Sequence, residues 1–251
     1  MLNHPIISER YFFPRKAHLE SPYLVDAADG SSLACRYIEI PNATKTLVHF
    51  HGNGEIVSDY RGPLEEAFKS LGCNICFVEY RGYGASTGIP ALEGMLDDVD
   101  CLFKALNTSE ERLIVMGRSV GSLYAVHLVH RFPLIAGLVL ESGIADVLER
   151  LLLRMRPEEL EVSLAEMEAA VNASFNQQKK LSSYKGPLLV LHAEKDFLVD
   201  VSHGKRLHQW GGGSQKELNI FPDGDHNSIM MVNWQDYWQK MKSFIDGVNG
   251  K

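Results

Sequence analysis

The amino-acid sequence predicts an α/β protein in which mostly parallel strands are joined by crossover helices. Short apolar, β-rich runs alternate with longer helix-like segments along most of the 251 residues. No internal repeat or low-complexity tract interrupts this series. A chain of this length can bury one substantial core, and sheets flanked by helices often reach this size as one domain. We therefore expect residues 1–251 to form a single domain.

The strands are predicted from short apolar runs bounded by turn residues. The first two runs lie close enough to form an antiparallel hairpin across Asp29-Gly30. Helical segments separate the later runs, which is the arrangement of parallel strands with crossover connections. The expected strands cover residues 23–27, 32–40, 46–50, 74–80, 113–116, 136–140, 188–191 and 218–221.

The helices are predicted from segments between these strands. Residues 60–71 are expected to form the first crossover helix, and residues 122–131 run without a breaker until Pro133. In residues 92–106, the apolar side chains with the spacing of one helical face are Leu96, Val99, Phe103 and Leu106. The packing face of a final helix is predicted to consist of Trp234, Tyr237, Trp238, Met241, Phe244 and Ile245.

The longest insertion lies between two of the predicted strands, at about residues 143–186. It is helical and amphipathic, and Pro157 interrupts its pattern. Its apolar stripe consists of Val147, Leu148, Leu151, Leu152 and Met155. These side chains either line an acyl pocket beneath a small helical cap or pack onto the core, and the sequence leaves both alternatives open.

Composition excludes several classes of function. The formal net charge of −7 and the pI near 5.8, with no block of Lys or Arg, argue against a nucleic-acid partner. No apolar span is long enough for a transmembrane segment, and residues 1–10 lack the apolar core of a signal peptide. Four irregularly spaced cysteines do not make a disulfide framework, so we expect free thiols and a cytoplasmic protein. The spacing of Cys73 and Cys76 has no matching second pair and indicates buried thiols rather than a metal site.

Residues 117–121, Gly-Arg-Ser-Val-Gly, lie between a strand-like run and a helix-like run. A serine in this context turns so sharply that its backbone is strained, and flanking glycines remove Cβ atoms that would collide with neighbouring elements. Its hydroxyl is then exposed beside a helix N-terminus, whose free N–H groups stabilise a developing oxyanion. The context predicts that Ser119 is a catalytic nucleophile.

Candidate partners for this serine follow in the chain order acid, then histidine. Asp196 lies on a loop that leaves the strand at 188–191, and His226 lies in the turn-rich loop after the strand at 218–221. A hydroxyl nucleophile needs an imidazole to accept its proton, and the imidazole needs a carboxylate to fix its tautomer. Asp200 is the alternative acid, although its position suggests a helix N-cap. We expect His192, at a strand end, to be structural.

A glycine-rich loop at residues 51–54, His-Gly-Asn-Gly, follows the strand at 46–50. Glycines allow the backbone to approach a reacting carbonyl closely, so we expect the backbone N–H groups of Asn53 and Val120 to form the oxyanion hole. His51 is predicted to brace this loop by hydrogen bonding.

Two arginines beside these loops are predicted to be structural rather than substrate-binding. Arg81 opens an Arg-Gly-Tyr-Gly loop, and we expect it to pair with a nearby carboxylate. The strand-to-helix turn at residues 117–121 is referred to as the elbow. Arg118 could bind an anionic substrate, but a salt bridge beneath the elbow, for example to Glu141, is the favoured expectation.

The motifs at 51–53, 81–84 and 117–121 resemble those of the α/β-hydrolases, and in particular the Bem46-like and depalmitoylase-like branch. The resemblance covers nearly the whole chain. It implies an eight-stranded, mostly parallel sheet, hydrolysis of an ester, thioester or amide, and catalytic roles for Ser119, Asp196 and His226. The chain departs from the pattern at Glu194, where a small or glycine-like residue is often found.

The sequence therefore predicts a serine hydrolase that acts through an acyl-enzyme and needs no cofactor and no metal. A carboxylesterase or thioesterase acting on a small-molecule or acylated substrate is the leading expectation. An amidase or aminopeptidase-like hydrolase, and a non-catalytic binding module on the same fold, remain alternatives. The sequence does not specify the acyl chain, the leaving group or the oligomeric state.

Overall fold

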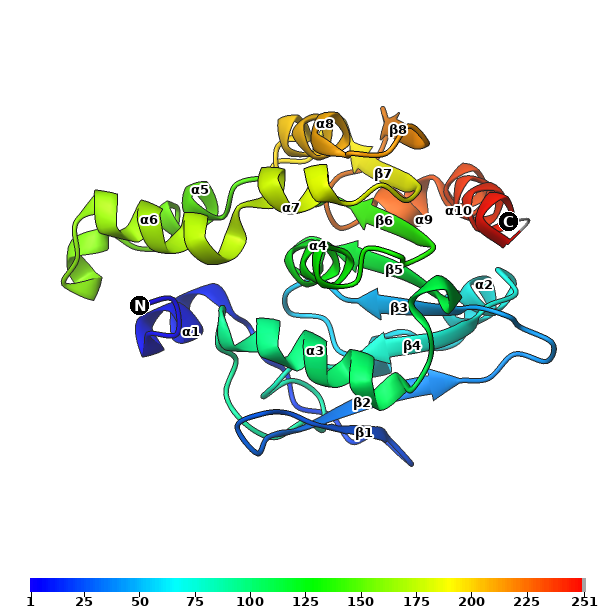
Figure 1. Cartoon of the computed structure of the whole chain (residues 1–251), viewed down its shortest axis with the longest axis horizontal. Helices are drawn as coiled ribbons and strands as arrows, with labels where there is room; N and C mark the ends of the chain where they lie inside the picture. Colours follow the sequence, from blue (N-terminus) through cyan, green and yellow to red (C-terminus); the bar gives the residue numbers. More distant parts are fainter. Residues whose placement is uncertain (250–251) are drawn as a thin grey trace.

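The computed structural model describes residues 1–249 and has an eight-stranded sheet with the strand order β1-β2-β4-β3-β5-β6-β7-β8 (Figure 1). The strands are β1 (Tyr23–Asp26), β2 (Ser32–Ile38), β3 (Thr46–Phe50), β4 (Asn74–Val78), β5 (Leu113–Arg118), β6 (Gly137–Glu141), β7 (Leu188–Ala193) and β8 (Lys216–Phe221). The pairs β1/β2 and β2/β4 are antiparallel, and the pairs from β4 through β8 are parallel. The predicted hairpin and the mostly parallel sheet are confirmed.

Helices of different lengths connect and flank these strands. The α-helices are α1 (Pro5–Tyr11), α2 (Pro63–Lys69), α3 (Gly94–Leu106), α4 (Gly121–Arg131), α5 (Val147–Leu152), α6 (Leu164–Phe175), α7 (Gln177–Ser183), α8 (Val201–Trp210), α9 (Ile229–Val232) and α10 (Trp234–Asn249). Three short 3₁₀ helices are η1 (Val57–Asp59), η2 (Glu110–Arg112) and η3 (Pro157–Leu160).

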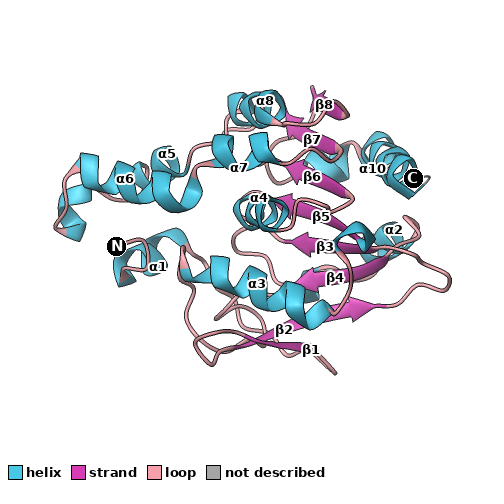
Figure 2. Cartoon of the chain, viewed as in Figure 1, coloured by secondary structure: helices cyan, strands magenta, loops and turns pink. Residues whose placement is uncertain are grey.

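Alternate residues of the central strands pack on opposite faces of the sheet, where helices lie on both sides (Figure 2). Val48 on β3 belongs to a buried cluster with α3, α4, α7 and α8. Its neighbour Leu47 belongs to a second cluster with α2 and α10. The same alternation separates Val115 from Ile114 on β5. Continuous apolar runs therefore form these strands because both faces are buried.

The first crossover helix is shorter than the sequence predicts. Gly62 has a positive φ of 61°, and Pro63 occupies the first turn of α2, so the helix begins there rather than at residue 60. The preceding residues form η1 instead. Helix α3 begins at Gly94 and ends before Asn107, which has left-handed backbone angles.

The N-terminal segment packs over the loops that follow β3 and β4. The backbone N–H of Gly84 donates to the carbonyl of Arg15 at 2.7 Å, and Ala17 N–H donates to the carbonyl of Gly84 at 3.2 Å. The backbone N–H of Phe13 donates to the side chain of Asn53 at 3.0 Å. These contacts bring the residues after α1 to the carboxyl edge of the sheet.

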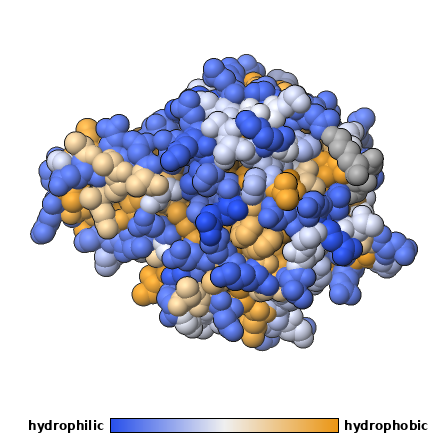
Figure 3. All heavy atoms as spheres, in the orientation of Figure 1, coloured by the Kyte–Doolittle hydropathy of each residue, from blue (hydrophilic) through white to orange (hydrophobic). Residues whose placement is uncertain are grey.

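The helices α5, α6 and α7 occupy the insertion between β6 and β7. Helices α5 and α6 extend beyond the sheet at the left of Figure 1, whereas α7 lies beside α4. Within the predicted apolar stripe, Val147, Leu151 and Met155 are buried in the core cluster. Leu152 is 41% exposed, and hydrophobic side chains gather at this end of the face seen in Figure 3. Most of the stripe thus packs onto the core, which was one of the two alternatives that the sequence left open; the other was that it lines an acyl pocket.

Only Ser119 and Val120 separate the end of β5 from the start of α4, so the chain turns sharply there. Ser119 has φ of 52°, in the left-handed region that non-glycine residues rarely adopt. A Cβ atom on Gly117 would lie 2.6 Å from the carbonyl oxygen of Gly121. A Cβ atom on Gly121 would lie 2.7 Å from the carbonyl oxygen of His51 and closer still to that of Phe50. Gly117 therefore allows α4 to pack closely on β5, and Gly121 allows α4 to approach the end of β3.

We expect Gly121→Ala to destabilise the protein by about 1–3 kcal/mol or more, because backbone rather than a flexible side chain must move. The control is Gly247→Ala in α10, where an added Cβ would meet no atom within 4 Å. That change should stabilise the protein by about 0.5–1 kcal/mol, since alanine favours a helix interior over glycine. Urea unfolding measures both, and a neutral Gly121→Ala would contradict this account of the turn.

Candidate active site

A pocket of about 260 Å³ lies at the carboxyl edge of the sheet. Its walls include one residue after each of five adjacent parallel strands: Asn53 after β3, Ser119 after β5, Ile144 after β6, Leu198 after β7 and His226 after β8. Ligand sites of open α/β sheets lie at this edge because the strand ends and their loops converge there.

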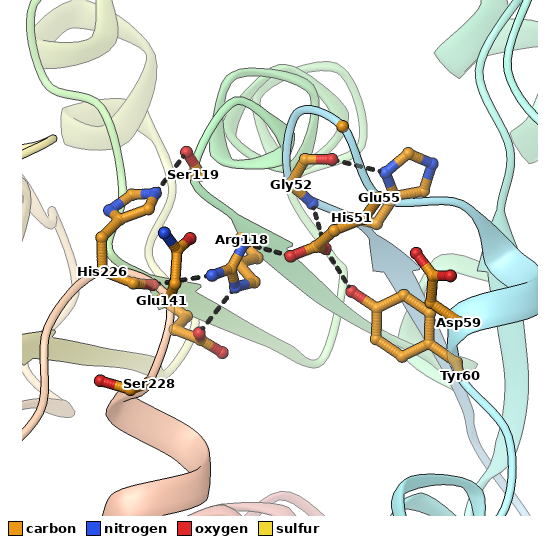
Figure 4. Close-up of polar contacts among 12 residues, drawn as sticks. His51, Gly52, Glu55, Asp59, Tyr60, Arg118, Ser119, Glu141, His226 and Ser228 are labelled. Atoms are coloured by element: carbon orange, nitrogen blue, oxygen red, sulfur yellow. Dashed lines mark hydrogen bonds and ion pairs between the residues drawn. The ribbon is translucent and has the colours of Figure 1, made fainter. Parts of the chain in front are cut away.

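Three of the predicted site residues lie within hydrogen-bonding distance of one another. His226 Nε2 lies 2.9 Å from Ser119 Oγ, as Figure 4 shows, and His226 Nδ1 lies 2.7 Å from Asp196 Oδ2. All three residues are buried, with 8%, 5% and 3% of Ser119, His226 and Asp196 exposed. A carboxylate only accepts hydrogen bonds, so Nδ1 carries the proton and Nε2 is free to accept from the serine hydroxyl.

Asp196 is held by four hydrogen-bond donors. Its Oδ1 accepts from the backbone N–H groups of Leu198 at 3.0 Å and Val199 at 2.8 Å. Its Oδ2 lies near His226 and also 3.3 Å from His192 Nε2. Burial raises the pKa of Asp196, but the hydrogen bonds from the two histidines and the backbone outweigh it and hold that pKa well below its usual range.

The alternative acid is occupied elsewhere. Asp200 is the N-cap of α8, where its carboxylate accepts from the backbone N–H of Ser202 at 2.9 Å. Asp225 accepts from the backbone N–H groups of Asn227 and Ser228 and forms the turn beside His226. The N-cap position of Asp200 agrees with the role suggested by the sequence.

His192 contributes more to the site than the sequence indicated. Its Nε2 lies 2.8 Å from the carbonyl of Val199 and close to Asp196, and both partners are acceptors. Nε2 must therefore carry the proton, while the buried Nδ1 has no partner within the described residues. His192 thus positions the acid and its turn. Its spacing of four residues before Asp196 at a strand end is the sequence signal that could have revealed this contact.

The two predicted oxyanion donors face the same pocket as Ser119. Val120 is the N-cap of α4, and Asn53 is fixed by its side chain. The Asn53 amide oxygen accepts from Phe13 N–H at 3.0 Å and Tyr83 O–H at 2.7 Å, and its nitrogen donates to the carbonyl of Tyr11 at 2.5 Å. Across residues 1–249, no hydrogen bond uses the backbone N–H of Asn53 or Val120. Both N–H groups are available to a bound oxygen.

His51 braces the loop that carries Asn53. Its Nδ1 lies 2.7 Å from the carbonyl of Gly52, and its Nε2 lies 2.8 Å from Glu79 Oε1. Burial lowers the pKa of His51, but the Glu79 carboxylate outweighs burial and raises that pKa above its usual value. A protonated ring can donate to both acceptors, in agreement with the bracing role expected from the sequence.

Arg118 joins three parts of the site beneath the elbow (Figure 4). Its guanidinium donates to Glu141 at 3.0 Å, to the carbonyl of His226 at 2.7 Å, and to Glu55. Glu55 in turn accepts from the backbone N–H of Gly52 at 2.7 Å. Burial opposes ionisation of Glu55, but Arg118 outweighs it and lowers the pKa of that carboxyl to about 2. The predicted salt bridge between Arg118 and Glu141 is confirmed, and Glu55 is a further partner.

Arg81 is also committed to the structure. It donates to both carboxylate oxygens of Asp98 at 2.6 Å and to Asp29 at 2.6 Å. The cysteines at positions 35, 73, 76 and 101 form no disulfide bond within the described residues, and the first three are buried. In the described part of the chain, no group of three His, Cys, Asp or Glu side chains is suited to a metal ion. No helix within residues 1–249 is long and apolar enough to cross a membrane.

We expect Arg118→Met to cost about 3–5 kcal/mol at neutral pH, because it leaves the buried Glu141 and the half-buried Glu55 without their cation. The control Arg131→Met breaks an exposed pair with Asp100 and should cost at most about 1 kcal/mol. Urea unfolding measures the free energy of both variants, and equal losses would contradict the assigned role.

The pH dependence of the same experiment has a defined sign. In the wild type the pKa of Glu55 is lowered from 4.5 to about 2, so its stabilisation is present above about pH 4.5 and lost as the pH falls toward 2. In Arg118→Met, Glu55 loses the cation that lowers its pKa, so this pH-dependent stabilisation is absent from the variant. The stability difference between the two proteins should therefore narrow below pH 4.5.

Comparisons with known proteins agree with this architecture. A family model described as serine aminopeptidase, S33, matches residues 41–165, which is just under half of the chain. Human alpha/beta hydrolase domain-containing protein 17B is 26% identical over 89% of this chain and 74% of its own length. Mouse protein 17C is 28% identical over 87% of this chain and 65% of its own length. The chain thus spans under two thirds of the 17C relative.

A solved structure shows the same fold. Esterase Pf2001 of Pyrococcus furiosus aligns with a TM-score of 0.71 over 96% of this chain and 94% of its own, at 19% sequence identity. This similarity concerns the fold alone, whereas the family model and the relatives carry the sequence relationship. The chain therefore has the α/β-hydrolase fold and is distantly related in sequence to these α/β-hydrolase domain proteins.

Proposed function

We propose that the protein is a serine hydrolase that cleaves a carboxylic ester or thioester through an acyl-enzyme. The observation that carries the proposal is the contact of 2.9 Å between His226 Nε2 and Ser119 Oγ, with Asp196 on the far nitrogen of the ring. This is the arrangement in which an imidazole accepts a proton from a hydroxyl nucleophile.

In the proposed reaction, Ser119 Oγ attacks the substrate carbonyl while His226 Nε2 accepts the hydroxyl proton. Asp196 stabilises the imidazolium and holds the proton on Nδ1. The backbone N–H groups of Val120 and Asn53 donate to the oxyanion of the tetrahedral intermediate. The imidazolium then protonates the leaving group, and His226 activates a water molecule that releases the acid from Ser119.

The lining and size of the pocket support an acyl substrate of modest length. Val120, Ile144, Leu198 and Val199 supply apolar surface close to Ser119. The volume of about 260 Å³ is slightly below the range of about 300–1,000 Å³ for pockets that hold drug-sized ligands. We therefore propose short or medium acyl groups.

A second candidate is an aminopeptidase-like amidase, because the matching family model is described as a serine aminopeptidase. Amides have poorer leaving groups than esters, so the two activities separate on matched substrates. Comparison of p-nitrophenyl butyrate with butyryl p-nitroanilide decides between them, since the acyl group is common to both.

We further propose that residues 1–251 act as one catalytic domain, with about residues 143–186 serving as a small cap over the pocket. Ile144, Arg150 and Arg154 from this region line the pocket, which supports the assignment. None of the four cysteines takes part in a disulfide bond within residues 1–249, which is compatible with a reducing compartment, and we propose a cytoplasmic location.

A fluorophosphonate probe, which reacts with activated serines, should label the wild type, and Ser119→Ala should abolish labelling. The same substitution should lower kcat/KM for p-nitrophenyl butyrate by about 10⁴-fold or more, because the nucleophile is lost. Ser202→Ala, on the exposed surface of α8, is the control and should be labelled normally. A folded wild type that resists labelling would instead favour the binding-module alternative.

Asp196→Asn should lower kcat by about 10³–10⁴-fold, because an amide no longer fixes the tautomer of His226 or stabilises its charged form. Asp200→Asn is the matched control, since asparagine also serves as an N-cap and should leave kcat within about twofold. Steady-state kinetics on p-nitrophenyl butyrate measures both. If the Asp200 variant shows the larger loss, the acid is misassigned.

A further inference from the structure

Two arginines in the pocket wall have no anionic partner. Arg150 on α5 and Arg154 just after it line the same pocket as Ser119. Within residues 1–249, neither guanidinium makes an ion pair or a hydrogen bond, and Arg154 contacts the Phe13 ring at 5.3 Å from its centroid. No Asp or Glu lines the pocket. In a chain whose net charge is −7, this is an uncompensated positive wall.

The third arginine of the pocket shows the contrast. Arg118 is buried and balanced by the carboxylates of Glu55 and Glu141. Arg206, which lies near α5, is likewise paired, with Glu149 at 3.3 Å. Arg150 lies on α5 and Arg154 two residues after its end, and both line this pocket, so their like charges repel one another. Such a pair is stabilised when an anion lies between the two guanidinium groups.

The arginine pair lies next to the loop that carries the proposed oxyanion donor. Arg154 stacks over Phe13, whose backbone N–H is bonded to Asn53. Tyr11 lines the pocket, its carbonyl accepts from Asn53, and no hydrogen bond within the described chain engages its hydroxyl. Burial raises the pKa of Tyr11 to about 12, although Arg150 and Arg154 both act to lower it. The tyrosine hydroxyl is therefore a neutral donor beside two cations.

We propose that Arg150 and Arg154, with the Tyr11 hydroxyl, form a subsite for a carboxylate or phosphate group on the substrate. The inference deepens the proposed hydrolase function and rests on it. A guanidinium presents paired donors that match the oxygens of either anion. The apolar wall of Ile144 and Leu198 accommodates the uncharged part of the molecule. The substrate class is thus an ester or thioester that carries an anionic group near its acyl carbonyl.

The first test compares p-nitrophenyl esters of adipic acid monoanion and hexanoic acid, which share chain length and leaving group. The wild type should prefer the anionic ester by about tenfold or more in kcat/KM, as one charge-assisted hydrogen bond implies. Arg150→Gln and Arg154→Gln should each reduce this ratio, mainly through KM, and higher ionic strength should reduce it as well. Arg156→Gln, an exposed arginine outside the pocket lining, makes the same change in net charge and should keep the ratio.

A second pair places the anion on the leaving group: the hexanoate esters of 4-hydroxybenzoate and 4-hydroxybenzamide. An arginine-dependent preference in either pair supports the subsite and identifies which side of the ester carries the charge. Absence of a preference in both pairs, or a preference that survives both arginine substitutions, overturns the proposal.

Binding to the Ser119→Ala protein separates this proposal from the hydrolase assignment. Calorimetry with the adipate and hexanoate esters needs no turnover. Binding of the anionic ester about tenfold more tightly, lost in the added arginine substitutions, supports the subsite even if the wild type hydrolyses neither ester. Equal affinities within this pair and also within the pair that carries the charge on the leaving group overturn the subsite, even if the wild type hydrolyses all four esters.

Discussion

The interaction on which the site depends is the buried cluster of Arg118 with Glu55 and Glu141. One guanidinium reaches the loop after β3, the end of β6 and the backbone of His226. Charged groups removed from water are costly unless all their oxygens accept hydrogen bonds. Here Glu55 also accepts from Gly52 N–H and the Tyr60 hydroxyl, and Glu141 accepts from the Tyr237 hydroxyl. The cluster ties together loops that are distant in sequence and would otherwise move independently. The cluster fixes the positions of His226 and of the loop that carries Asn53.

The sheet supplies the second constraint. Parallel strands all end at one edge, so residues after β3, β5, β7 and β8 converge without any local sequence relation between them. Apolar runs buried on both faces hold these strands in the core, Gly117 allows α4 to pack closely on β5, and Gly121 allows it to approach β3. The strain at Ser119 is borne by this packing. Hydrogen bonds from His192 and from the backbone of Val199 then hold Asp196 at the correct distance.

Much of this could be predicted from the sequence, because it depends on local patterns and chain order. Alternating apolar runs predicted the sheet, and glycines around a serine predicted the elbow. What escaped prediction depends on tertiary contacts. The contact of His192 with Asp196 requires the actual turn geometry. The first crossover helix, α2, is shorter than predicted because Gly62 has a positive φ. The placement of Tyr11 in the pocket could not be foreseen, since the N-terminal segment has no periodicity that indicates where it packs.

That N-terminal segment connects the wall of the pocket to the loop after β3. Tyr11 and Phe13 form part of the pocket wall, yet neither belongs to the sheet or to the loops that carry Ser119, Asp196 and His226. They reach the site through a few hydrogen bonds to Asn53, Tyr83 and Gly84. Because Phe13 and Tyr11 also hold the side chain of Asn53, a change in this segment would alter the wall of the pocket and the loop after β3 together.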